Sequence, residues 1–135
     1  MLGRFGRSGG GPVPGANKVK YIAEKVDGVF ILEVTGNLDG GAETLTIKDA
    51  IKAELNGGGR RILVDMHQVE FVNSTAIGML VSIQVACATV EAELKFCRMQ
   101  RRVQRSLQAT GACILESMSL YDTRAVALEA FAGRP

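Results

Sequence analysis

Two strand-like runs come first in the pattern of apolar and polar positions. Apolar residues dominate 19–26 and 29–36, and only Asp27 and Gly28 separate the two runs. An Asp-Gly pair tolerates positive φ at both turn positions, which makes it typical of tight turns between antiparallel strands. The pattern therefore predicts an antiparallel hairpin.

The pattern then becomes helical, and afterwards strands and helices alternate. Ile47, Ile51 and Leu55 repeat every four residues, and the glycines at 57–59 end that helix. Later strands are expected at 60–66, 94–99 and 113–117, and later helices within 69–90 after a turn, at 100–110 and at 123–131.

This alternation predicts a single α/β domain with the element order β-β-α-β-α-β-α-β-α. Strands separated by helices need crossover connections, so we expect a mostly parallel sheet, opened by the antiparallel hairpin, with helices packed against it. The domain is expected at residues 18–132. Residues 1–17 are rich in glycine and proline and contain no apolar run, so they are predicted to form a flexible leader.

A short polar cluster, Asn73-Ser74-Thr75, interrupts the apolar stretch VEFVNSTAIGML. Side chains of this kind can cap the helix that follows, because they accept hydrogen bonds from its unpaired backbone N–H groups. The same helix end carries a partial positive charge and can stabilise a phosphate group. Phosphorylation there would add negative charge and bulk to a small, neutral surface, which suits a switch that expels a docked partner.

Charge and hydropathy argue against nucleic-acid binding and against a membrane span. The formal net charge is only +2. A basic cluster has no aromatic ring between its arginines, so a solvated helix face is favoured over a phosphate-binding patch. Its members are Lys95, Arg98, Arg101, Arg102 and Arg105. No charge occurs from Phe71 to Val90, but polar residues interrupt this stretch, and a helix buried in an α/β domain explains it better than a membrane span.

The cysteines and the N-terminal segment indicate a cytoplasmic protein. Cys87, Cys97 and Cys113 are odd in number, form no C-x-x-C pair and lie in apolar segments. We therefore expect buried, reduced thiols. The first 17 residues lack the apolar run that a signal peptide needs.

The residues do not indicate an enzyme. His67 is the single histidine and is expected in a loop after a strand. Ser74 does not lie in a G-x-S-x-G turn, and the glycine runs lack the known phosphate-binding fingerprints. The carboxylates Asp39, Asp65 and Glu70 have no pairing that their spacing establishes. We therefore expect no catalysis, no metal and no cofactor.

The sequence resembles the STAS domain, the fold shared by bacterial anti-sigma factor antagonists and the cytoplasmic tails of sulfate transporters. The resemblance runs from Lys18 to Phe131 and rests on four segments, VTGNLD, RILVDM, VEFVNSTAIGML and LQATG. In the antagonists the third segment usually reads aspartate, serine, serine or threonine, glycine. Its first serine accepts phosphate from an anti-sigma factor kinase.

The resemblance implies that Ser74 is the phosphoacceptor and that its neighbours bind the partner. Asn73 stands where the family has aspartate, and Ala76 where it has the first glycine of the motif. Thr75 matches the hydroxyl residue after the phosphoacceptor. Asp39 matches an acidic residue that many members carry near the phosphoacceptor, whereas the residues alone favour a turn or capping role for it.

Asp65 ends a predicted buried strand, and we expect it next to the same docking face. As for Asp39, both a structural role and a role in partner binding stay open, because the spacing of the residues identifies no side chain that pairs with Asp65.

Three functions are compatible with these features. The first is a regulatory protein of the anti-sigma factor antagonist type, which binds an anti-sigma factor or serine kinase and loses it when Ser74 is phosphorylated. The second is a non-switching STAS subunit of a lipid-transport or signalling assembly, for which Asn73 and Ala76 would be no handicap. The third is a sensor that binds a small ligand or a nucleotide in the same groove.

Removal of residues 1–17 is expected to leave the fold intact, because this segment offers no apolar surface to bury. The melting temperature should change by about one or two degrees, measured by circular dichroism on the full and the shortened chain. A loss of about ten degrees would show that the leader packs on the domain.

Overall fold

The computed structural model describes residues 19–109 and 118–132. Within these residues the chain forms a five-stranded sheet in the order β1-β2-β3-β4-β5. The strands are β1 (Lys20–Val26), β2 (Val29–Leu38), β3 (Arg61–Val72), β4 (Glu93–Cys97) and β5 (Leu120–Tyr121). The helices are α1 (Ala42–Asn56), α2 (Ser74–Thr89), α3 (Arg101–Ala109) and α5 (Arg124–Ala132). The predicted α/β class and element order are confirmed.

The predicted hairpin is also confirmed. Strands β1 and β2 pair antiparallel, and the other neighbouring strands pair in parallel. Asp27 has φ 53° and Gly28 has φ 82°. Both turn residues are therefore left-handed, the conformation that matches a two-residue turn to the twist of its strands.

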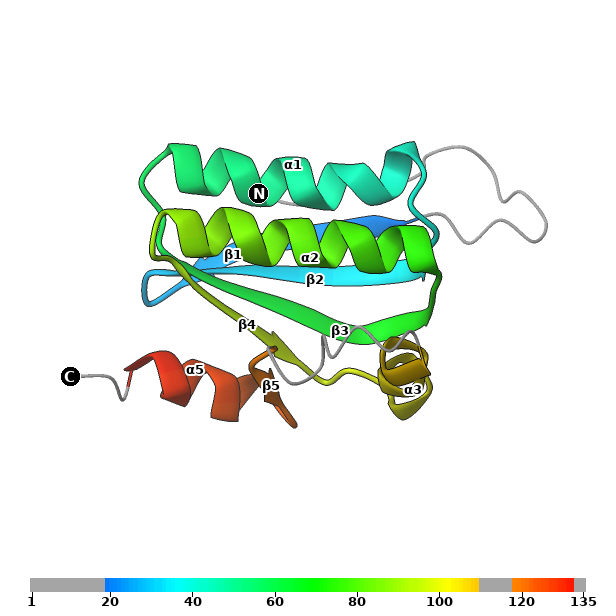
Figure 1. Cartoon of the computed structure of the whole chain (residues 1–135). Coiled ribbons are helices and arrows are strands. Elements are labelled where there is room, and N and C mark those ends of the chain that lie inside the picture. Colours follow the sequence, from blue (N-terminus) through cyan, green and yellow to red (C-terminus); the bar gives the residue numbers. More distant parts are fainter. Residues whose placement is uncertain (1–18, 110–117, 133–135) are drawn as a thin grey trace.

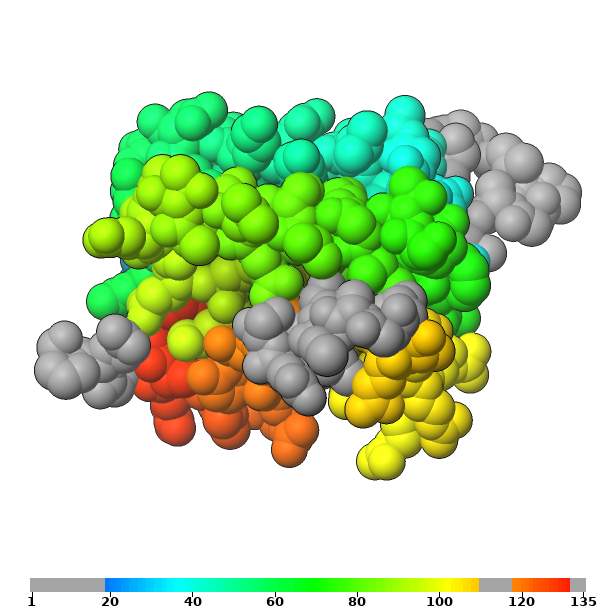
Figure 2. Space-filling view, in the orientation of Figure 1, coloured from blue at the N-terminus to red at the C-terminus, as the bar shows by residue number. Residues whose placement is uncertain are grey.

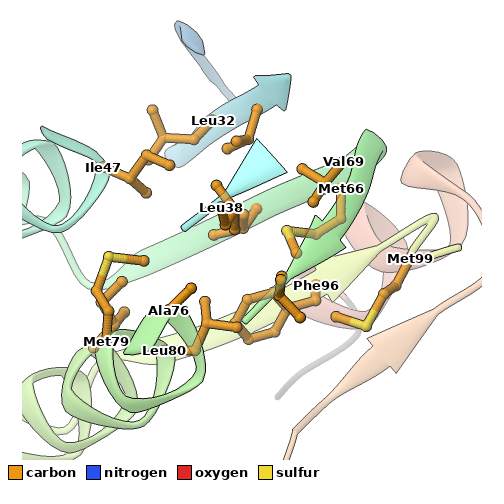
Figure 3. Close-up of a cluster of buried hydrophobic side chains, with 14 of the residues drawn as sticks. Leu32, Leu38, Ile47, Met66, Val69, Ala76, Met79, Leu80, Phe96 and Met99 are labelled. Carbon is orange, nitrogen blue, oxygen red and sulfur yellow. The ribbon is translucent and has the colours of Figure 1, made fainter. Parts of the chain in front are cut away.

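The helices cover the two faces of the sheet unequally. Helices α1 and α2 lie side by side along one face, and α5 lies on the other (Figure 1). On β3, Ile62 and Val64 enter the larger core beneath α1 and α2, whereas Leu63 packs with Phe131 of α5. Figure 3 shows side chains of the sheet and of α2 gathered in the larger core. The central strands are thus buried on both faces, as parallel strands usually are.

Strand β3 is longer than the sequence predicts. It continues to Val72, so His67 lies in an exposed strand position and the predicted loop is wrong. The register between β2 and β3 shifts twice. As a result Met66 and Val69 both face the core while the two residues between them are exposed. Such bulges break the alternation by which a strand is recognised in a sequence.

The predicted strand at 113–117 lies outside the described residues. The structure places β5 at Leu120–Tyr121, where it pairs with Phe96 and Cys97 of β4. The C-terminal edge of the sheet is therefore made by a very short strand.

Asp65 is fully buried in β3, on the face that α5 covers. Arg98 donates two hydrogen bonds to its carboxylate, at 3.1 and 2.7 Å. Arg124 of α5 donates two more, at 3.2 and 2.8 Å, and also pairs with Glu24 and Glu33. The carboxylate therefore ties α5 to the sheet, and the expectation that it borders the start of α2 is wrong.

The arginines keep Asp65 ionised. Burial alone would raise the pKa of this carboxyl, but hydrogen bonds from Arg98 and Arg124 and from the backbone N–H of His67 outweigh burial, so the pKa lies below its usual range. A lowered pKa in the folded state means that the carboxylate contributes stability above the pKa it has when unfolded. That stability is lost as the pH falls through the folded pKa.

Two predicted thiols are confirmed as buried and free. Cys87 and Cys97 form no disulfide, and Cys113 lies outside the described residues. Burial raises the pKa of Cys87 to about 11. Burial, together with the nearby Asp65 carboxylate, raises the pKa of Cys97 to about 12. Neither thiol is a nucleophile at neutral pH.

The basic cluster divides into parts with different roles. Arg101, Arg102 and Arg105 lie exposed on α3, as a solvated helix face predicts. Lys95 is instead buried, with its ammonium 5.0 Å from the ring centre of Phe131. Arg98 is committed to the Asp65 carboxylate, so the cluster is not one continuous patch.

We expect Asp65→Asn to lower the free energy of unfolding by about 3 kcal/mol at pH 7, because two arginines then face an uncharged partner. Urea denaturation measures the change. Glu70→Gln, on an exposed position of the same strand, should change it by less than about 0.5 kcal/mol. The difference in the free energy of unfolding between wild type and Asp65→Asn should become smaller as the pH falls below about 4. Equal stability at pH 7 would contradict this role of Asp65.

Candidate docking site at the start of helix α2

Asn73 is the N-cap of α2. Its backbone is extended, with φ −105° and ψ −179°, and its side-chain Oδ1 accepts a hydrogen bond of 2.9 Å from the backbone N–H of Ala76. Its own carbonyl accepts the N–H of Ile77 at 3.0 Å. Capping is therefore the work of the amide side chain, and the neighbouring hydroxyl of Ser74 is not needed for it.

The same amide joins α2 to the loop between β2 and α1. Nδ2 of Asn73 donates a hydrogen bond of 2.9 Å to the backbone carbonyl of Asp39. The backbone N–H of Asn73 donates to the carbonyl of Leu38 at 3.2 Å. An aspartate could accept from Ala76 but could not donate to Asp39, so the amide makes a connection that the usual family residue lacks.

Asp39 closes the loop that faces Asn73. Its Oδ1 accepts from the backbone N–H of Gly41 at 2.9 Å and from the hydroxyl of Thr44 at 3.2 Å. The first of these bonds contributes most to holding the pKa of this carboxyl below its usual range. Gly41 is the N-cap of α1 and offers no side chain. Asp39 therefore has the turn role favoured by the residues, and it presents a charged, exposed carboxylate beside Asn73.

Gly40 and Thr75 pack closely across the two loops. Gly40 has φ 82°, and a Cβ at this position would overlap the methyl group of Thr75. Only glycine satisfies both the backbone angle and the available space. Thr75 is thus fixed in position by the facing loop, although it remains exposed.

The remaining predicted site residues differ in accessibility. Ser74 is exposed at the first position of α2, and its hydroxyl makes no hydrogen bond to any described residue. Ala76 is fully buried in the larger core (Figure 3). A methyl group there contacts the core and not the solvent. The structure thus brings Asp39, Asn73 and Thr75 together around Ser74, with Ala76 beneath them.

The sequence analysis did not identify one exposed residue of this region. Phe71 lies two positions before Asn73 and is 47% exposed, an unusual degree for a phenylalanine in a strand. An aromatic residue in a strand that is buried elsewhere does not signal exposure by itself. Phe71 lies on the face opposite the buried Val72, and its neighbours in the sequence do not indicate that this position is exposed.

The described residues, 19–109 and 118–132, show neither a metal-binding cluster nor a membrane-spanning helix. Among these residues there is no group of three histidine, cysteine or carboxylate side chains that could hold a metal ion. No helix in that part of the chain is both long and apolar enough to span a bilayer, including α2 with its 16 residues.

The fold is that of a small α/β domain whose parallel sheet is opened by an antiparallel hairpin. The STAS domain model matches residues 20–127, and the chain belongs to the STAS domain family.

The individual proteins that this chain is similar to have low sequence identity with it. A protein of Bordetella bronchiseptica with the provisional name anti-sigma factor antagonist BtrV is 21% identical over 113 residues, which cover 84% of this chain and 95% of that protein. An anti-sigma factor antagonist from Mycobacterium paratuberculosis has a similar structure, with TM-score 0.69, 23% identity and coverage of 84% of this chain and 93% of that chain. SpoIIAA of Bacillus in its phosphorylated form gives TM-score 0.63 and 16% identity, covering 82% and 98%. These structural likenesses show the fold.

We expect Asn73→Ala to lower the free energy of unfolding by about 1–2 kcal/mol, because both the cap and the link to Asp39 are lost. Ser74→Ala should change it by less than about 0.5 kcal/mol, since this hydroxyl bonds to no described residue. Urea denaturation of both variants is the measurement. A larger loss for Ser74→Ala than for Asn73→Ala would show that the cap is assigned to the wrong residue.

Proposed function

We propose that the chain is an anti-sigma factor antagonist that binds an anti-sigma factor with serine kinase activity. The docking surface consists of the exposed residues Asp39, Ser74 and Thr75 and the half-buried Asn73 between them. The kinase transfers the γ-phosphoryl group of ATP to Oγ of Ser74, the hydroxyl proton is lost and ADP leaves. The phosphorylated chain then releases its partner. The chain acts as a substrate and a binding protein in the cytoplasm and performs no catalysis of its own.

The observation that carries the proposal is the freedom of the Ser74 hydroxyl. It is exposed and unbonded within the described structure because Asn73 supplies the cap. A kinase can therefore reach this hydroxyl without disturbing the fold. Thr75 is a poorer acceptor, because its side chain packs against Gly40.

The electrostatics at this helix end favour a phosphate locally. The first turn of α2 has no acidic residue, and the backbone N–H groups of the first turn point out of the helix. Opposite this turn, Asp39 stays ionised because its pKa is lowered. A partner that contacts the neutral first turn and Asp39 would meet up to two added negative charges after phosphorylation.

The family relatives support this mechanism by analogy. SpoIIAA, whose fold the chain shares, is known in a phosphorylated form. The partner-binding residues are expected among the exposed ones. Ala76, which is buried, would act on binding only by setting the packing of the first helical turn.

We expect Ser74→Ala to bind the kinase as wild type does and to accept no phosphate. Ser74→Glu should bind at least about a hundredfold more weakly, because a charge is placed in the interface without a counter-ion. Attraction to the helix end recovers only about 0.3–1 kcal/mol. Calorimetric titration with the cognate kinase and mass spectrometry after incubation with ATP measure the two effects.

Thr46→Glu is the matched control, because it places the same charge on an exposed hydroxyl position of α1. This variant should bind within about twofold of wild type. Equal binding by wild type, Ser74→Ala and Ser74→Glu, with no phosphate on Ser74, would reject the switch. The non-switching STAS subunit would then be the better account.

A further inference from the structure

The outward face of α2 carries an apolar stripe made of Gly78, Val81, Val85 and Ala88. Val81 is 40% exposed and Val85 is 59% exposed, and the two small residues at the ends are exposed as well. The spacing of three, four and three residues places all four on one side of the helix, as in the seam of a coiled coil. This α2 stripe is separate from the buried face, which Ile77, Leu80 and Ile83 form.

Helix α2 has the composition of a helix that is covered on every side. It carries no charged residue from Ser74 to Thr89, and its apolar residues occupy both faces. Helices of this kind are normally buried all round, because an exposed face would carry charges. Figure 2 nevertheless shows α2 at the surface beside α1.

We propose that the α2 stripe is the contact surface between two copies of this chain, whose α2 helices pack antiparallel about a two-fold axis. A symmetric pairing centred between Val81 and Val85 sets each Val81 against Val85 of the second copy. Gly78 then faces Ala88 of the second copy. Small residues at both ends of the contact allow the helices to approach closely, and the valines fill the centre.

Charge favours the antiparallel arrangement over the parallel one. Glu91 is exposed just beyond the end of α2. A parallel pair would bring the two Glu91 residues together, and like charges repel. In the antiparallel pair each Glu91 comes near Ser74 of the second copy, at a helix end with partial positive charge and no acid in its first turn. The surface is therefore complementary to itself.

The contact is small, so the dimer is weak. A helix of 16 residues is about 24 Å long. We expect a contact of this length, with only two valines and two small residues from each chain, to bury less than the roughly 1,200 Å² of a standard stable interface. We therefore expect a dissociation constant on the order of tens to hundreds of micromolar. This inference does not rest on the proposed kinase partner.

The first test is the oligomeric state of the full chain by sedimentation velocity, from about 10 µM to about 1 mM. The mass should rise toward that of two chains. Val85→Lys should weaken the dimer at least about tenfold, because two lysines would meet opposite valines at the centre of the contact. Val126→Lys is the matched control, since Val126 is 48% exposed on α5, and its dimer should stay within about twofold of wild type.

The second test addresses orientation. Ser74→Glu should weaken the dimer several-fold by repulsion from Glu91 of the second copy, and adding Glu91→Lys to the same chain should restore it. Circular dichroism checks that each variant folds. A chain that stays monomeric at about 1 mM, or a dimer that Val85→Lys leaves unchanged, would overturn the proposal. If Val85→Lys abolishes the dimer but Glu91→Lys does not reverse the weakening caused by Ser74→Glu, the antiparallel arrangement is overturned.

Discussion

A single amide side chain, that of Asn73, organises the docking site. Its oxygen caps α2 through Ala76, and its nitrogen holds the carbonyl of Asp39 in the facing loop. The carboxyl ends of β2 and β3 are neighbours in a parallel sheet, so the loops that follow them are already close. The hydrogen bonds of Asn73 hold the two loops in a fixed geometry, and this geometry does not depend on the side chain of Ser74. The departure from the family aspartate therefore adds a tie between the loops and removes a charge.

The two faces of the sheet differ in their electrostatics. Beneath α5, the buried Asp65 carboxylate forms salt bridges with both Arg98 and Arg124, and the three side chains make one ionic cluster. Helix α2, on the opposite face, has no charged residue along its length. A negative charge added at the start of α2 would therefore not be neutralised by the arginines of the cluster, which are held by Asp65 on the far side. This separation makes the first turn of α2 sensitive to a phosphate.

Local signals were sufficient for most of the fold. The Asp-Gly turn, the repeat of Ile47 and Ile51, and the break in hydropathy at Asn73 depend on residues close in sequence, and each predicted its element correctly. The family resemblance brought Ser74 and Asp39 to one region, but which of the neighbouring side chains forms the cap could not be read from residue types, because serine, threonine and asparagine all cap helices.

The features that were missed depend on contacts between distant residues. The bulges in β3 arise from its pairing with β2, which keeps His67 in the strand, and the exposure of Phe71 depends on how the helices cover that end of the strand. The place of Asp65 beneath α5 depends on Arg124, which is 59 residues away. The burial of Ala76 follows from the way α2 lies on the sheet. No local pattern carries this information.

The two proposed surfaces meet at Ser74. Partner docking would use the first turn of α2, whereas self-association would use the α2 stripe, which begins at Gly78 and brings Glu91 of the second copy near Ser74. The two contacts would therefore exclude one another at this helix end. A phosphate on Ser74 would weaken partner docking because the surface would no longer be neutral. It would weaken self-association because it would repel Glu91 of the other copy. A single modification would therefore release the chain from both contacts, and the concentration of free chain would depend on phosphorylation in two ways.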